Sequence, residues 1–160
     1  LLERVLASER AAMGSKVEFK RDFDPSLPPV IGDSDHLQQA FQNLIRNAAE
    51  AAMDGDTSGK VTVRTSYAAG LSFRQARLGA GLRRAMLVSV EDTGKGIARN
   101  RQSTIFEVFQ SSKSGARGLG LSIVKEVVTA HGGQIRVDSV PGSTRFSVLL
   151  PLGTGEKTDG

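Results

Sequence analysis

The chain has 160 residues, a formal net charge of +4 at pH 7, 39% hydrophobic residues and no cysteine. This length predicts one domain with a true hydrophobic core, and the lack of cysteine excludes disulfides, thiolate chemistry and cysteine-bound zinc. No apolar run approaches the ~18 residues that span a membrane, and no signal segment opens the chain. We therefore expect a cytoplasmic domain without a membrane partner, and the opening Leu1 indicates a fragment of a longer protein.

The positive charge points to an anionic partner, either a nucleic acid or a nucleotide. The arginines are dispersed along the chain, and only 5% of the residues are aromatic, with one tyrosine and no tryptophan. A base-stacking platform for nucleic acid is hard to build from this composition. We therefore favour a solvated basic surface over a nucleic-acid footprint and expect no DNA partner.

Hydrophobic periodicity divides the chain into helices and strands. Gly14 ends the first expected helix, and Asp33 or Asp35 can cap a long helix that follows a proline-rich turn. The expected elements are, in chain order, helix 1–13, strand 16–23, helix 33–53, strands 60–67 and 85–92, helix 119–131, and strands 134–139 and 143–150. This order predicts an α/β sandwich, in which one mixed sheet carries helices packed on a single face.

Three stretches lack a clear period. Residues 70–82 are rich in glycine and arginine and are expected to form a long hairpin connection. Residues 93–118 alternate glycines with basic residues and serines, around a short apolar patch at 105–109. Residues 153–160 are polar and are expected to form a flexible tail.

The long second helix carries a polar stripe beside its apolar one. Asn43, Asn47 and Glu50 recur at one-turn spacing along the border of the apolar stripe. Two carboxamides and a carboxylate at the edge of a core can form a binding site. The alternative, that they simply face solvent, is equally compatible with the helix taken alone.

Asp92 ends the clearest strand. Alternation places it on the same face as Val88 and Val90, so its carboxylate points toward the apolar side. A carboxylate there is costly unless a hydrogen-bond donor meets it. Gly94 and Gly96 follow at once and allow the backbone to approach a ligand closely. This arrangement suits the exocyclic amine of adenine, although an ordinary Asp-Gly turn would read the same way.

A glycine-rich stretch leads into the third helix, which is expected to begin at Leu119. Free backbone N–H groups and the helix dipole at that end favour phosphate, and Lys113 and Arg117 add positive charge. The stretch is neither a phosphate loop of the G-x-x-x-x-G-K-[ST] type nor a dinucleotide fingerprint, and flexible glycine loops are common. The glycines in question are Gly115, Gly118 and Gly120.

One ligand would account for the polar stripe of the second helix, for Asp92 with its glycines, and for the glycine-rich stretch before the third helix. A polyphosphate needs a divalent cation, which prefers oxygen ligands and keeps several waters. Asn47 can offer one carboxamide oxygen, with Asn43 and Glu50 nearby. Adenine would then lie at Asp92, magnesium at Asn47 and the phosphates under the glycine stretch.

The polar stripe, the segment after Asp92 and the glycine-rich stretch follow one another in the chain in this order. Together they resemble the N-box, the two glycine boxes and the intervening F-box of histidine-kinase ATP-binding domains. Those domains belong to the superfamily of gyrase, heat-shock chaperone, histidine-kinase and mismatch-repair ATPases (GHKL). The resemblance covers 2–152. The runs RDFDPSLP and QNLIRNAAEA, and the ending DSVPGSTRFSVLLP, are similar to sensor kinases of the nitrogen-regulation (NtrB) type.

The resemblance implies a two-layer Bergerat-type ATP-binding fold, with a mainly antiparallel sheet and a flexible ATP lid anchored by Phe106 and Phe109. It implies that 1–152 form the catalytic domain, with helix 1–13 leading in from an absent dimerisation domain. Asn47 would hold Mg²⁺ with help from Asn43, and Asp92 would read adenine. Asn43, Asn47 and Lys113 would be the catalytic residues. The further ATP contacts would be Glu50, Gly94, Gly96, Lys113, Gly115, Gly118, Leu119 and Gly120.

Three positions depart from the family pattern. The family usually has Asn and Pro where this chain has Thr93 and Lys95, and Thr where it has Arg117. All three lie in segments expected to be flexible. We therefore expect altered affinity or lid stability rather than loss of ATP binding.

Asn43 bears on the reaction. The ATPases of this superfamily carry a Glu there that activates water, whereas Asn cannot act as a general base at neutral pH. This favours phosphoryl transfer to an external nucleophile, in which the protein mainly positions groups and stabilises charge. His36 lacks the acidic residue that follows the family's acceptor histidine, and His131 precedes Gly-Gly, so neither is expected to be the phosphoacceptor.

The expected function is therefore that of a sensor histidine kinase catalytic domain, acting on a histidine in the absent dimerisation domain. The implied partners are that domain, a response regulator and a PII-type signalling protein. The intact kinase would be a homodimer and this fragment a monomer. The alternatives are an ATP-binding interaction module without phosphotransfer and, more weakly, a nucleic-acid-binding domain.

Overall fold

A computed structural model describes residues 1–55, 58–68, 84–107 and 115–152, with 115–119 described by their backbone alone. Five strands form one sheet in the order β1-β2-β3-β5-β4, and β1 and β2 are parallel while the other neighbours are antiparallel. The bounds are β1 Val17–Phe23, β2 Gly59–Tyr67, β3 Ala85–Asp92, β4 Gln134–Val140 and β5 Ser143–Pro151. The mixed, mainly antiparallel sheet confirms the expected fold class.

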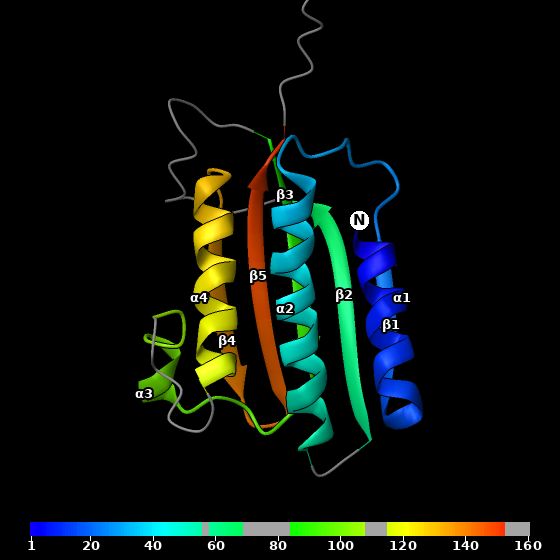
Figure 1. Ribbon diagram of the computed structural model, residues 1–160, viewed down its shortest axis with the longest axis vertical. Helices are drawn as coiled ribbons and strands as arrows, with labels where there is room; N and C mark the ends of the chain where they lie inside the picture. The colour runs from blue at the N-terminus through cyan, green and yellow to red at the C-terminus, as the bar shows by residue number, and fades with distance from the viewer. Residues whose placement is uncertain (56–57, 69–83, 108–114, 153–160) are drawn as a thin grey trace, which may run out of the picture.

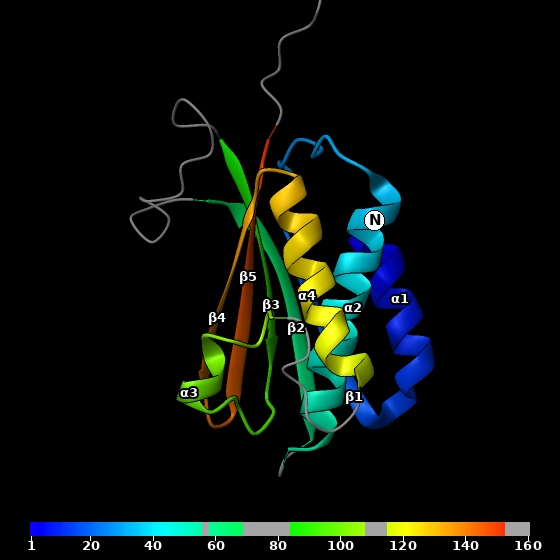
Figure 2. The same ribbon diagram turned by 60° about the vertical axis from the view of Figure 1, so that its left-hand side comes forward.

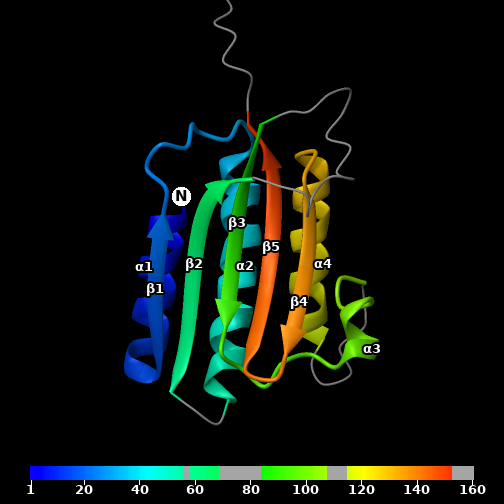
Figure 3. The same cartoon turned by 180° about the vertical axis from the view of Figure 1, so that it is seen from behind.

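One face of this sheet is covered by α1 Leu2–Met13, α2 Ser34–Met53 and α4 Gly115–Ala130, as Figures 1 and 2 show. The 3₁₀ turn η1 Gly14–Lys16 follows α1, and the short helix α3 spans Arg99–Gln102. α3 lies at the edge of the sheet beside β4 (Figure 3). Among the described residues, no helix is long and apolar enough to span a membrane.

α2 is the central helix of the covering layer. Asp33 caps it, because its carboxylate accepts hydrogen bonds from the N–H groups of Asp35 and His36, both at 3.0 Å. The apolar stripe of α2 is buried in the core, where Leu44 and Ile45 are fully inaccessible. The inward side chains of the middle strands complete this core from below.

Strand alternation is confirmed where the sequence predicts it. On β2 the buried side chains are Val61, Val63 and Thr65. On β3 the buried inward side chains include Val88 and Val90. The inward face of the sheet is therefore the one that the period-two pattern indicates.

The described parts of 93–118, which are 93–107 and 115–118, contain more helix than their composition indicates. They include α3, and α4 begins at Gly115 rather than Leu119. On α4, Val124 and Val128 are buried at 1% exposure, whereas Ile123 and Val127 are half-buried. The expectations for 70–82, for Phe109 and for the tail 153–160 fall outside the described residues.

α1 carries a buried acid that hydrophobic periodicity did not reveal. Glu9 has no exposed surface, although it lies on a helix whose expected inward residues are apolar. Arg46 of α2 donates to it at 2.8 Å, and the Gln42 amide donates at 3.4 Å. Because the acid pairs with groups 33 and 37 residues away in the chain, α1 is attached to α2 by polar contacts as well as apolar ones.

Candidate functional site

The sequence-predicted site elements converge at one end of the molecule. Figure 1 shows the C-terminal end of α2, the end of β3, α3, the N-terminus of α4 and the β4–β5 turn together at that end. β3 brings its last residue there because it runs antiparallel to β5, which begins at the same end. The sandwich therefore juxtaposes segments that are far apart in the chain.

The polar stripe of α2 lies at the edge of the core, as expected. Asn43, Asn47 and Glu50 are half-buried, while Leu44 and Ala48 between them are fully buried. The stripe therefore lies along the border of the buried face of α2 and not on its fully exposed face.

α4 packs beside this stripe. A side chain at Gly120 would place its Cβ 3.9 Å from Asn43 Cβ, so the start of α4 faces the middle of α2. The absence of a side chain at Gly120 leaves room between Asn43 and the α4 backbone. A ligand group can approach the backbone of α4 closely at this point.

Asp92 is buried at the end of β3, with 2% of its surface exposed. Its Oδ1 accepts a hydrogen bond from the Gly94 N–H at 2.9 Å. The pKa of Asp92 is raised to about 6, chiefly by burial; the Gly94 N–H acts in the opposite direction, and the neighbouring Glu91 charge adds to the rise. The prediction that this carboxylate points into the apolar side is confirmed.

The turn after Asp92 fits tightly between α2 and the β4–β5 hairpin. A Cβ on Gly94 would lie 2.6 Å from the Ala51 carbonyl oxygen and 2.8 Å from Asp92 Oδ1. Gly96 has φ +88°, and a Cβ there would lie 2.8 Å from the Val140 carbonyl oxygen. Both positions therefore require glycine, for lack of space and, at Gly96, also for backbone conformation.

The two departures beside these glycines differ in their surroundings. Thr93 Oγ1 accepts the Lys60 N–H at 3.0 Å, and the Thr93 N–H donates to the Lys60 carbonyl oxygen at 3.2 Å. Thr93 thus extends the pairing of β2 with the chain beyond β3. Lys95 is exposed.

The glycines of the third stretch lie partly inside α4. Because α4 begins at Gly115, Gly118 and Gly120 are in its first two turns rather than in a loop before it, which corrects the expected helix start. The N–H groups of the first turn have no partner within a helix and can bind an anion. Lys113 lies outside the described residues, and the side chains of Arg117 and Leu119 are not described.

Sequence reasoning missed several polar residues on the other side of Asp92. Thr144 pairs with Asp92 in the β3–β5 register and is only 3% exposed. Its hydroxyl lies 2.6 Å from Ser139 Oγ. The signal that identifies Asp92, a polar residue at an inward position of an alternating strand, identifies Thr144 as well.

Phe106 lies at the edge of the core near this end. Its ring meets Phe146 edge-on, with centroids 6.0 Å apart and planes at 80°. Ile105 beside it is buried at 8% exposure. The F-box therefore packs against the sheet through Ile105 and Phe106, whereas Phe109 lies outside the described residues.

The oxygen atoms of the α2 stripe suit a hard cation that takes most of its coordination from nucleotide phosphates and water. The described residues contain no cluster of three His, Asp or Glu side chains that could hold a metal ion by themselves. Mg²⁺ is usually bound by one or two protein oxygens together with substrate phosphates and water. The half-buried carboxamides of Asn43 and Asn47 fit such a partial coordination.

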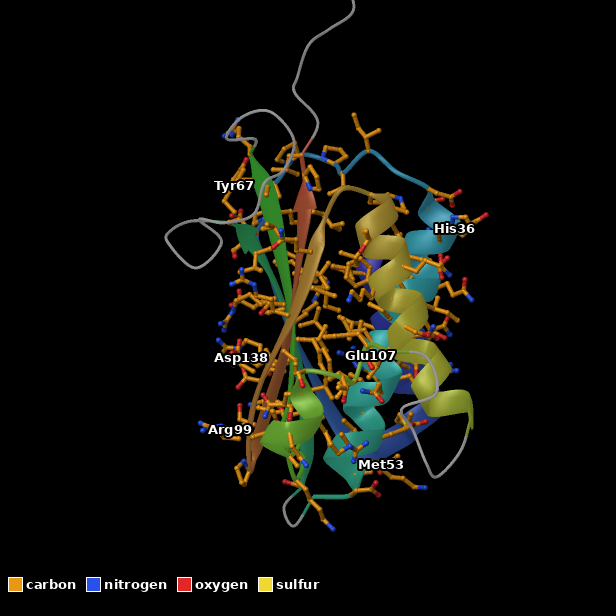
Figure 4. All side chains as sticks on the ribbon, turned by 90° about the vertical axis from the view of Figure 1, so that its left-hand side faces the viewer. His36, Met53, Tyr67, Arg99, Glu107 and Asp138 are labelled. Atoms are coloured by element: carbon orange, nitrogen blue, oxygen red, sulfur yellow. The ribbon has the colours of Figure 1, made fainter. Side chains whose placement is uncertain are left out.

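Both histidines lie at the far end of α2 from Asn47. Figure 4 shows His36 at one end of α2 and Met53 at the other. His131 Nε2 accepts the Asp33 N–H at 3.1 Å, and its Nδ1 lies 2.7 Å from the Val127 carbonyl oxygen. His131 therefore joins the end of α4 to the start of α2, away from the candidate site.

Comparison with known proteins agrees with this geometry. Residues 32–154 match the family described as histidine kinase-, DNA gyrase B-, and HSP90-like ATPase. The chain is 40% identical to the sensory histidine kinase/phosphatase NtrB of Rhodobacter capsulatus over 156 residues, which cover 98% of this chain and 43% of that protein. The chain thus spans less than half the length of this relative.

Solved structures of histidine kinases have a similar fold. The mycobacterial sensor histidine kinase MprB matches with a TM-score of 0.72 and 32% identity, over 93% of this chain and 90% of that one. Full-length ShkA in complex with AMPPNP matches with a TM-score of 0.71 and 25% identity, over 97% of this chain and 31% of that one.

Proposed function

Because the chain belongs to the family of histidine kinase-, DNA gyrase B- and HSP90-like ATPases, we propose that it is the ATP-binding catalytic domain of a sensor histidine kinase of the nitrogen-regulation type. The observation that carries this proposal is the buried Asp92 with its Gly94 contact, at the same end of the fold as the half-buried stripe of α2. The AMPPNP in the ShkA structure supports an adenine nucleotide as the ligand.

In this proposal each side chain has a positioning role. The Asp92 carboxylate accepts the exocyclic amine of adenine and fixes the base. The first-turn N–H groups of α4 bind phosphate oxygens, with Lys113 as an additional cationic contact. Asn43 and Asn47 orient the polyphosphate, and Glu50, Leu119 and the glycines at 94, 96, 115, 118 and 120 line the nucleotide.

Mg²⁺ would be held by the Asn47 carboxamide oxygen with help from Asn43. When bound, the cation offsets the negative charge on the phosphates. Asn43 cannot accept a proton at neutral pH, so the site does not activate water through this residue. The acceptor is a histidine, whose neutral imidazole is itself a nucleophile and needs no base on α2.

The whole kinase would combine this domain with the dimerisation domain that carries the acceptor histidine. The name of the Rhodobacter relative supports a two-component system for nitrogen regulation, with a response regulator as the next acceptor. A PII-type protein is the regulatory partner that we propose. The intact kinase would be a cytoplasmic homodimer, and the 160-residue chain alone a monomer.

A transfer assay tests this function. The chain is incubated with the separately purified dimerisation domain of its own kinase and ATP labelled at the γ-phosphate. We expect label on the dimerisation domain, and none when its acceptor histidine is replaced by Gln. Nucleotide binding without transfer would instead support an ATP-binding interaction module.

The metal site has its own test in Asn47→Asp. The added carboxylate places a negative charge beside the phosphates, so we expect weaker ATP binding without metal. The ratio of the affinities with and without Mg²⁺ should change by about tenfold, which corresponds to about 1.4 kcal/mol. Isothermal titration calorimetry with and without EDTA measures both affinities.

Asn100→Asp is the matched control, because it makes the same change on the exposed surface of α3. It should alter neither affinity by more than about twofold. An unchanged metal ratio in Asn47→Asp, with the fold intact, would show that Asn47 does not hold the cation.

A further inference from the structure

The turn after Asp92 is attached to the β4–β5 hairpin by its backbone. The Gly142 N–H donates to the Gly94 carbonyl oxygen at 3.0 Å. Further along, the Ile97 N–H donates to Ser139 Oγ at 2.8 Å. The segment that carries the Gly94 contact of Asp92 is therefore held at both of its ends by one hairpin.

Gln102, the last residue of α3, closes this attachment. Its side-chain amide donates to the Ile97 carbonyl oxygen at 2.9 Å and to the Ser139 carbonyl oxygen at 3.1 Å. One NH₂ group thus bridges the turn and the hairpin. The side chain is half-buried, so water cannot fully replace these two bonds.

Ser139 is the centre of the contacts. Its Oγ receives the Ile97 N–H and lies 2.6 Å from Thr144 Oγ1, and its carbonyl oxygen receives the Gln102 amide. Thr144 in turn is the cross-strand neighbour of Asp92. We call the Gln102 and Ser139 side chains, with the Ile97 backbone that both contact, the turn latch.

We propose that Gln102 and Ser139 are positioning residues for recognition of the nucleotide base. They act through the backbone between Gly94 and Ile97, and they keep the Gly94 N–H on Asp92 in the geometry that leaves the other carboxylate oxygen for the ligand. The inference rests on the proposed nucleotide site, and it assigns a role to two residues that lie outside it.

The latch has an energetic reason to matter for this carboxylate. Asp92 is buried, and Gly94 is a hydrogen-bond donor to it. If the turn shifts, the carboxylate loses a donor that favours its ionised form, and its orientation is no longer fixed. The base would then meet a carboxylate that must be reorganised on binding, at a cost in affinity.

Gln102→Glu tests the latch with almost no change of shape. The carboxylate replaces two N–H donors by acceptors that face two carbonyl oxygens. We expect the ADP dissociation constant, measured by calorimetry on the 160-residue chain, to rise about tenfold. The ¹⁵N-labelled protein should also show displaced amide signals for Gly94 and Ile97. Asn100→Asp makes the corresponding amide-to-carboxylate change at an exposed position of α3. It should leave the ADP dissociation constant within twofold and the amide signals of Gly94 and Ile97 unshifted.

A second pair of variants separates positioning from folding. Ser139→Ala removes the hydroxyl and should raise the ADP dissociation constant in the same way, whereas Ser139→Thr retains a hydroxyl and should restore it. Thermal unfolding establishes that each variant is folded at the assay temperature. If Gln102→Glu does not fold, the Ser139 pair decides the question.

Folded latch variants that bind ADP as well as the unsubstituted chain would overturn the proposal. Equal weakening by Ser139→Ala and Ser139→Thr would do the same, because the hydroxyl would then be irrelevant. Failure of the unsubstituted chain to bind ADP would instead contradict the proposed function, so the two failures are distinguishable.

Discussion

At the scale of single residues, burial of the Asp92 carboxylate lowers the stability of the fold, whereas the proposed site uses the same carboxylate for binding. It is ionisable, 2% exposed and aligned with the apolar face of β3. A well-packed fold would place an apolar side chain there, because a buried carboxylate loses its hydration. The Gly94 N–H offsets only part of that loss, since the pKa stays raised. The proposed nucleotide site gives this buried carboxylate a role that the fold alone does not.

Asp92→Asn should therefore stabilise the ligand-free chain at neutral pH. The folded pKa is about 6 and the ordinary value is 3.8, so between these values the folded state binds more protons than the unfolded state. The contribution of Asp92 to the unfolding free energy is therefore most favourable below pH 3.8 and is lost as the pH rises through 6. Between pH 5 and pH 8 we expect the variant's advantage in unfolding free energy to grow by about 1 kcal/mol.

Urea unfolding of both proteins at pH 5 and pH 8 measures this advantage. The difference between the two proteins cancels the titration of all other groups that the substitution leaves unaffected. An advantage that stays constant between pH 5 and pH 8 would show that Asp92 is ionised throughout this range and would contradict the prediction. The same variant should bind ADP weakly at both pH values.

At the scale of elements, α4 contains a glycine that lowers its helix stability and that the proposed site would use for close approach of the nucleotide. Gly120 lies inside the helix, and a glycine there costs about 1 kcal/mol relative to alanine. The nearest atom to an added Cβ is Asn43 Cβ at 3.9 Å, which is an ordinary contact, so packing does not require glycine. In the proposed nucleotide site, the reason for glycine is the close approach of the ligand to the α4 backbone.

Gly120→Ala should accordingly raise the unfolding free energy by about 0.5 to 1 kcal/mol and lower the affinity for ATP. Gly94→Ala is the contrasting variant, because its Cβ would lie 2.6 Å from the Ala51 carbonyl oxygen, and it should lower both. Chemical unfolding and calorimetric titration supply the two quantities. A destabilised Gly120→Ala would mean that α4 does not have a regular helical backbone at this position.

The contact between α1 and α2 depends on a buried acid. Arg46→Met would leave the buried Glu9 carboxylate without its guanidinium partner and with the Gln42 amide at 3.4 Å. Removing one partner of a buried ion pair typically costs about 3 kcal/mol, and we expect about 2 to 3 because the Arg46 side chain is 47% exposed. Urea unfolding measures the loss.

Arg64→Met is the control for this prediction. Arg64 pairs with Asp22 at 2.8 Å, but both side chains are more than half exposed, so the loss should stay below about 1 kcal/mol. Replacing both partners, Glu9→Leu with Arg46→Met, should recover most of the stability. Equal losses for Arg46→Met and Arg64→Met would show that burial of Glu9 is unimportant.

At the scale of the whole molecule, the two faces of the sheet have different roles. The helices cover one face, and Figure 3 shows the sheet from the other face, which they leave open. That open face carries cross-strand ion pairs between Asp22 and Arg64 and between Glu91 and Arg145. Arg145 holds the pKa of Glu91 below its ordinary value. These arginines are thus neutralised by carboxylates, which argues against that face as a nucleic-acid surface.

Ligand binding should consequently depend on the base and not on bulk charge. At 100 times its dissociation constant, ADP should raise the unfolding free energy by about 2.7 kcal/mol. GDP at the same concentration should raise it far less, and duplex DNA not at all at physiological salt. A thermal shift assay with the three ligands checks this, and a salt-dependent shift by DNA that MgATP does not displace would favour the nucleic-acid alternative.

Local patterns predicted most of the helices and strands, and they predicted the burial of the candidate residues on β3 and α2. Strand alternation places Asp92 on the buried face, and helical spacing places Asn43, Asn47 and Glu50 at the core edge, because both periods depend only on neighbouring residues. The order of the three motifs indicates one nucleotide ligand. The start of α4 was placed four residues late, because glycines weaken the helical pattern although the tertiary structure has a helix there.

The sequence by itself determined the two-layer class, the burial of Asp92 and the family to which the chain belongs. Only the tertiary structure decided that β1 pairs in parallel with β2, that Glu9 meets Arg46, and that Gln102 and Ser139 hold the turn after Asp92. The reason is chain distance. Gln102 and Ser139 are 37 residues apart, as are Glu9 and Arg46, and no local periodicity reports on contacts over such separations.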